Sequence, residues 1–128
     1  MRKGVANRLK GWLFKAVVRS SMLYAAETWP VRKVETLKLD RTEMRMLRWM
    51  NGSNRKDHIT NESLRKTFGL EPVAQVLRRN RLRWLGHIVR RNEESVIRKC
   101  QQVRIDGDRP RGRPRLTWRA LVDVDLKY

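Results

Sequence analysis

Three arginines at helical spacing are the side chains in this sequence best suited to bind phosphate. The sequence around them predicts a helix that begins near Pro72, and about 3.6 residues per turn places Arg79, Arg83 and Arg90 on one side of it. Over about 16 Å of axis they offer three fork-shaped donors, which match the geometry of phosphate oxygens. No Asp or Glu lies within this helix. A face made only for solubility usually mixes both signs, so we expect nucleic-acid contact here, with a solvated charged face as the alternative.

A second basic stretch near the C-terminus predicts an extended, exposed arm. Its four residues Arg-Gly-Arg-Pro at 111–114 match the core of an AT-hook, which lies in the narrow minor groove of A·T-rich DNA. Glycine allows close approach to the groove floor, and proline keeps the flanking backbone extended. A motif this short is moderately specific, so a basic loop without a binding role is the alternative. The candidate contact residues of the arm are Arg109, Arg111, Gly112, Arg113 and Arg115.

Residue groupings for catalysis are few. The sequence has no Gly-rich phosphate loop, no paired carboxylates in an apolar setting and no Ser/His/Asp grouping. Residues 24–27, Tyr-Ala-Ala-Glu, lack both aspartates of the polymerase motif Tyr-x-Asp-Asp, which hold the two metal ions of phosphoryl transfer. One cysteine, Cys100, and two distant histidines, His58 and His87, do not make a metal cluster. We therefore expect no enzyme activity, no metal and no cofactor.

Length and charge limit the class of protein. A chain of 128 residues suggests one domain, and 31 Lys and Arg against 13 acids give a net charge of +18. This excess implies a polyanionic partner, and its arginine-rich composition favours nucleic acid over an anionic membrane. No run of about 18 apolar residues predicts a membrane span. The single cysteine fits a reducing compartment, so we expect an intracellular protein, nuclear or cytoplasmic.

Apolar periodicity predicts a mainly α-helical chain. Thr60 and Thr117 are expected helix N-caps, and Gly69 is expected to end a helix. The expected fold is a basic helical bundle in residues 1–92, followed in residues 93–128 by a short strand, the extended basic arm and a last helix. The expected elements are helices at about 5–27, 31–50, 61–68, 72–91, 93–100 and from 116 to the end, with the strand at 102–105.

The same periodicity predicts which side chains form the core. In the first helix it places an apolar stripe on one side and leaves Lys15 and Arg19 outside it. The helix at 31–50 is apolar on two sides, which is typical of a helix between two layers. The stripe of the first helix comprises Val5, Leu9, Trp12, Leu13, Ala16, Val17, Ser20 and Tyr24. The core residues expected over the whole chain are Trp12, Tyr24, Trp29, Leu77, Trp84, Ile88 and Trp118.

Several short segments follow a distinctive order. Residues 21–29, Ser-Met-Leu-Tyr-Ala-Ala-Glu-Thr-Trp, are similar to the pattern S-x-L-Y-G-x-E-T-W, except that Ala25 stands where that pattern usually has glycine. Residues 81–91 resemble R-L-R-W-x-G-H-x-x-R, and residues 42–48 resemble the segment between these two. Several such segments in the same order identify a protein family more specifically than any one segment alone.

The closing segment completes the resemblance. Residues 111–114 with Trp118 are similar to G-R-P-x-x-x-W, and residues 123–126 resemble the acidic-Leu tail that follows it. Over about residues 16–126 the chain therefore resembles the C-terminal region of the reverse transcriptases of non-LTR, LINE-like retrotransposons. In these polymerases the first segment follows the palm.

The resemblance implies a thumb and post-thumb region, whose helices grip the RNA or DNA template–primer duplex by its backbone. The fingers and palm, with the catalytic aspartates, and the endonuclease are not in this sequence, and the parent's fingers and palm are the implied protein partners. The leading hypothesis is thus a catalytically incomplete fragment of an RNA-directed DNA polymerase that binds nucleic acid. The alternatives are an autonomous DNA-binding protein that uses the AT-hook-like arm, and a degenerate element-derived reading frame without selected activity.

Overall fold

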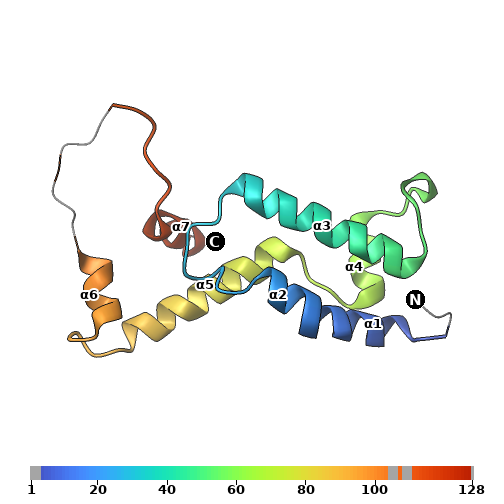
Figure 1. Cartoon of the computed structure of the whole chain (residues 1–128), viewed down its shortest axis with the longest axis horizontal. Coiled ribbons are helices and arrows are strands. Elements are labelled where there is room, and N and C mark those ends of the chain that lie inside the picture. The colour runs from blue at the N-terminus through green and yellow to red at the C-terminus, as the bar shows by residue number, and fades with distance from the viewer. Residues whose placement is uncertain (1–3, 104–106, 108–110, 128) are drawn as a thin grey trace.

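The computed structural model describes residues 4–103, 107 and 111–127, which form helices joined by loops (Figure 1). The described residues contain no strand, and the expectation of a mainly helical chain is confirmed. The strand expected at 102–105 is wrong where it is described, because a helix continues through Gln102; residues 104 and 105 lie outside the described part. The elements are α1 (Asn7–Leu13), the π-helical η1 (Phe14–Arg19), α2 (Ser20–Met22), α3 (Lys33–Asn51), the 3-10 turn η2 (Arg55–Asp57), α4 (Asn61–Phe68), α5 (Val73–Val89), α6 (Val96–Gln102) and α7 (Trp118–Asp125).

Two clusters of buried apolar side chains hold the helices together. Beyond both of them α5 continues, with α6 near its far end and α7 packed against it, so that the molecule is elongated (Figure 1). The first cluster lies between η1, α3 and α4 and contains Phe14, Met44, Leu47, Met50, Leu64, Phe68 and Leu70. The second joins the segment after α2 to the first half of α5 and contains Leu23, Ala26, Val31, Val73, Val76 and Leu77.

The expected helix ends are confirmed. The Thr60 hydroxyl accepts a hydrogen bond from the Ser63 backbone N–H at 3.2 Å, which caps α4. The same helix ends at Gly69, whose φ of +64° is a conformation that glycine adopts without a Cβ clash. Thr117 caps α7 in the same way as Thr60 caps α4. No helix in the described part of the chain is long and apolar enough to cross a membrane.

The first helical run buries a different face from the one expected. Trp12 is 62% exposed and Tyr24 is 82% exposed, so neither belongs to the core. Gly11 and Phe14 face inward instead, because the missing side chain of Gly11 lets α1 approach the backbone of α4 closely. The π-helical turn then rotates the following residues relative to a regular helical wheel.

Two further core predictions are corrected. The expected single helix at 5–27 ends at Met22, and Trp29 lies beyond it in a loop with more than half of its surface exposed. The two apolar sides expected of α3 are not both buried: Met44, Leu47 and Met50 face the core, whereas other members of each side are exposed. Val34 and Leu37 are exposed on the side that was expected to include Met44, and Met46 is exposed on the side that was expected to include Met50.

A buried ion pair lies between the two clusters. The Arg19 Nε donates to Glu43 Oε1 at 2.9 Å, and its Nη2 donates to the same oxygen and to the Glu71 backbone carbonyl at 2.7 Å. Both charged side chains are almost wholly inaccessible to solvent. Arg19 thereby joins η1 to α3 and to the connection between α4 and α5. The residue that the helical wheel had left outside the apolar stripe is thus a central packing residue.

The close approach of α1 to the backbone of α4 at Gly11 gives a stability test. A Cβ at Gly11 would lie 1.9 Å from the Phe68 carbonyl oxygen, so Gly11→Ala must push α1 away from α4. We expect this substitution to lower the free energy of unfolding by at least about 1–3 kcal/mol, as overpacking does.

Gly86→Ala is the matched control within α5. A Cβ there would meet only the end of the Arg90 side chain, at 3.1 Å, which can move aside. Because alanine favours helix by about 1 kcal/mol over glycine, this variant should melt at an equal or higher temperature than the wild type. Thermal melting followed by circular dichroism checks both variants, and equal melting temperatures would show that α1 does not pack against α4 as described.

Candidate nucleic-acid interface

The long helix α5 has the two faces that its sequence predicts. Pro72 precedes it, and Val73, Leu77 and Ile88 are buried on the inner face. Arg79, Arg83 and Arg90 are exposed. The apolar periodicity therefore placed the inner face of this helix correctly, and the three arginines lie outside that face.

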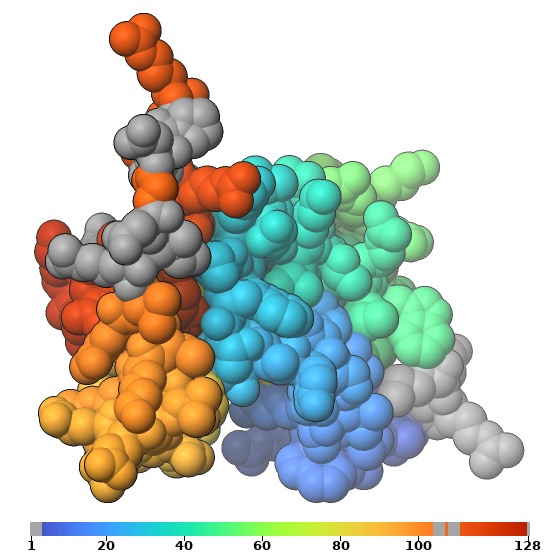
Figure 2. Space-filling model, turned by 60° about the vertical axis from the view of Figure 1, so that its left-hand side comes forward, coloured from blue at the N-terminus to red at the C-terminus, as the bar shows by residue number. Residues whose placement is uncertain are grey.

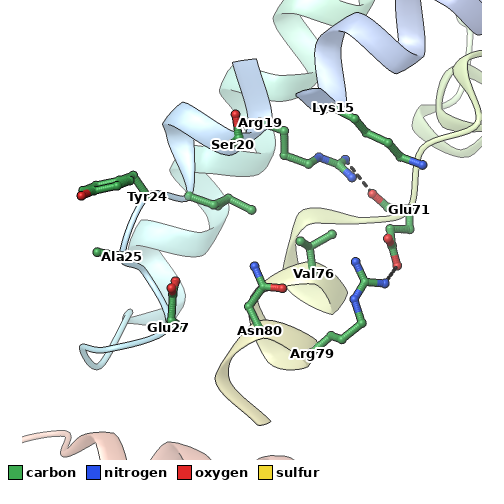
Figure 3. Close-up of a pocket in the computed structure, with 11 residues that line it drawn as sticks. Lys15, Arg19, Ser20, Tyr24, Ala25, Glu27, Glu71, Val76, Arg79 and Asn80 are labelled. Carbon is green, nitrogen blue, oxygen red and sulfur yellow. Dashed lines mark hydrogen bonds and ion pairs between the residues drawn. The ribbon is translucent and has the colours of Figure 1, made fainter. Parts of the chain in front are cut away.

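Of these three arginines, Arg79 is the one that is held in an ion pair. Its Nη1 donates to Glu71 Oε2 at 2.7 Å, and half of the side chain remains exposed (Figure 3). Glu71 stands just before the acid-free stretch, so the sequence pattern did not reveal this pairing. The two residues line a hollow of about 540 Å³ between the first helical run and α5 that also holds Lys15 and Glu27 (Figure 3). Because this hollow holds carboxylates as well as cations, it is a poorer phosphate site than the stretch of α5 that carries Arg83 and Arg90.

Arg83 and Arg90 are the strongest candidates for phosphate contact. Among the described residues neither guanidinium has a carboxylate within ion-pair distance. Arg83 lines a hollow of about 360 Å³ together with Glu27, Asn80, Trp84 and His87, and it makes no ion pair with Glu27. The Arg90 guanidinium lies over Gly86 at the end of α5. Both positive charges are therefore open to an external anion.

Other arginines of α5 have structural roles that the sequence reasoning missed. Arg81 is buried and its Nε donates to Asp125 Oδ2 at 2.6 Å, while Arg78 donates to the Asp125 backbone carbonyl at 2.6 Å. These bonds dock α7 on α5. The sequence contains a signal for this structural role. Arg81 falls on the same side of the helical wheel as Leu77 and Ile88, and an arginine on a buried face needs a hydrogen-bonding partner.

Two of the expected core tryptophans lie at the edge of the core. Trp84 is only partly buried, with its ring centroid 6.4 Å from that of His87. Trp118 is also partly buried, and its Nε1 donates to the Glu27 backbone carbonyl at 2.7 Å. This hydrogen bond ties the start of α7 to the segment after α2. The ring N–H of Trp118 is thus satisfied within the protein, and Trp84 borders the hollow that Arg83 lines.

The basic arm projects from the helices. Residues 111–117 are all exposed, and Gly112 has a φ of +150°, where glycine is favoured (Figure 2). In the part that the structure describes, no hydrogen bond or ion pair joins Arg111, Arg113 or Arg115 to a helix. Arg109 lies outside the described residues. Within the described residues the arm is therefore not bonded to the exposed arginines Arg79, Arg83 and Arg90, which form the outer face of α5.

Comparison with known proteins identifies no relative. No protein-family model matches the sequence, and no curated protein or solved structure is significantly similar to it. Within the described ranges, no group of three His, Cys, Asp or Glu side chains is placed to hold a metal ion. Cys100 is a free, exposed thiol.

The pairing of Arg79 with Glu71 gives a prediction about binding. Glu71→Gln removes the competing carboxylate but keeps the backbone carbonyl that accepts from Arg19. We expect tighter binding to a nucleic-acid duplex and a salt slope, log K against log [salt], that is steeper by up to about one unit. Fluorescence anisotropy at several salt concentrations measures both quantities.

Glu94→Gln is the matched control, since it removes the same charge from an exposed side chain that has no ion pair among the described residues. An equal gain in both variants would mean that only net charge matters and that Arg79 does not contact phosphate.

Proposed function

We propose that this chain is a nucleic-acid-binding helical module related to the thumb of non-LTR retrotransposon reverse transcriptases, and that it holds a template–primer duplex by its backbone. The observation that carries the proposal is the outer face of α5, where Arg83 and Arg90 stand exposed and unpaired among the described residues. Guanidinium groups on a rigid helix can contact successive phosphates without reading bases. The net charge of +18 adds long-range attraction to the same ligand.

One backbone feature supports the family part of the proposal. Ala25 stands where the family pattern usually has glycine, and it has a φ of +56°. Positive φ is the conformation that glycine adopts most readily, so the family's residue would suit this turn. The proposal assigns no polymerization step to this chain, because the segment at 24–27 lacks the two aspartates that would hold metal ions.

The basic arm supports a second candidate function. Arg111 and Arg113 flank Gly112 in an exposed stretch, as insertion into a minor groove requires. In this alternative the arm alone carries the affinity, and A·T-rich duplexes are preferred. The outer face of α5 would then contribute nothing to binding.

A pair of double variants decides between the two candidates. We expect Arg83→Gln with Arg90→Gln to weaken binding equally for every duplex sequence and to lower the magnitude of the salt slope by up to about two units, one for each lost phosphate contact. The melting temperature should stay nearly fixed, because exposed substitutions cost little stability. Anisotropy titrations with an RNA–DNA hybrid and with an A·T-rich DNA duplex measure the affinities.

Arg111→Gln with Arg113→Gln is the matched comparison, since it removes the same charge from the arm. If this variant loses affinity for the A·T-rich duplex while the α5 variant keeps its affinity and its slope, the arm is the binding site. That result would remove α5 from the interface and leave it as scaffold.

A further inference from the structure

The outer side of α3 carries an exposed tryptophan next to a line of arginines. Trp49 is 68% exposed, although the large ring of tryptophan gains much from burial in a core or an interface. Arg41 and Arg45 are also exposed, and Arg48 is partly buried. Spacings of four, three and one residue place these four side chains within about 100° of the helix circumference and about 12 Å of its axis.

These side chains line one groove. Its volume is about 710 Å³, and it lies between α3, the loop that follows it and the start of α4. The lining includes Arg41, Arg45, Arg48, Trp49, Arg55 and Asn61. No site residue assigned above belongs to it, so it is a separate surface from the outer face of α5.

The groove is partly organised before any ligand binds. Arg48 Nη2 donates to Asn61 Oδ1 at 2.6 Å and Nη1 donates to the Met44 carbonyl at 3.5 Å, which fixes the guanidinium at the groove wall. The one acid in the lining, Asp40, is engaged by Arg65 at 2.5 Å. The groove therefore presents several cations and one compensated anion.

We propose that this groove binds unpaired nucleotides of single-stranded nucleic acid, with a base stacked on Trp49 and the adjoining phosphates held by Arg41, Arg45 and Arg48. An exposed aromatic ring among cations is the arrangement that single-strand-binding proteins use, because every base has a face that can stack. A base paired within a duplex has no free face, so the groove discriminates by strandedness. The inference deepens the proposed function, since it shares nucleic acid as the ligand and adds a site for the unpaired strand.

The chemistry of the groove favours nucleic acid over an acidic protein segment. The arginines alone would attract either partner, but a flat ring beside them adds affinity for a base. Strands of DNA and RNA built on uracil offer the same base and the same phosphates and differ only in the 2′-hydroxyl, so the test includes both. A difference between them would show that the 2′-hydroxyl is read.

The test uses the full chain and three labelled probes, which are a dU12 strand, a U12 strand and a blunt 12-base-pair duplex. We expect Trp49→Ala to weaken binding of a single strand by about 5- to 150-fold, the range that corresponds to loss of one stacked base. Trp49→Phe should retain most of the affinity, because its ring still stacks. Binding of the blunt duplex should change little in either variant.

Trp12→Ala is the matched control, since Trp12 is as exposed as Trp49 but lies on α1. The inference is overturned if Trp49→Ala binds single strands as the wild type does, or if Trp12→Ala loses as much. It is also overturned if polyglutamate displaces the strand from the wild type and from Trp49→Ala equally well, which would indicate a charge-only site. If the wild type binds the duplex but Trp49→Ala changes nothing, this inference alone fails; if the wild type binds no probe, the proposed function fails with it.

Discussion

The buried charge of Arg19 is the constraint on which the rest of the fold depends. Its guanidinium joins Glu43 on α3 and the Glu71 carbonyl before α5, so three segments meet at one cation between the two apolar clusters. Removing one partner of such a buried pair typically costs about 3–5 kcal/mol, because the other charge is left without compensation. The same contact fixes the start of α5, and thereby the direction in which its outer face points.

Arginine consequently has two roles in this chain. Arg19, Arg65 and Arg81 pair with carboxylates inside the molecule and hold its helices together. Arg83 and Arg90 on α5, and Arg41 and Arg45 on α3, are exposed and have no carboxylate partner among the described residues. Net charge alone does not separate these roles, since it counts each arginine as +1 whether the side chain is paired and buried or exposed. The exposed group is the one that can replace counterions around nucleic acid.

The sequence predicted the elements better than the packing. Caps at Thr60 and Thr117, the end at Gly69 and the inner face of α5 follow from local rules, and the structure confirms them. The buried face of the first helical run was predicted wrongly because a helical wheel counts Trp12 as apolar and ignores Gly11. Close packing of α1 on α4 requires a small residue at the contact, so Gly11 lies inward and Trp12 is exposed. The pairing of Arg79 with Glu71 and the groove at Trp49 depend on tertiary contacts that spacing along one helix does not encode.

A nitrogen–hydrogen correlation spectrum of the arginine Nε groups, recorded with and without an RNA–DNA duplex, tests the central claim that structural and binding arginines are distinct groups. Arg19 and Arg81 donate through Nε to Glu43 and Asp125, at 2.9 and 2.6 Å, so their protons should be protected from exchange in the free protein and unmoved by the ligand. The signals of Arg83 and Arg90 should shift or appear when the duplex is added. Shifts confined to Arg19 and Arg81, with Arg83 and Arg90 unchanged, would contradict the assignment of the outer face of α5 as the binding surface.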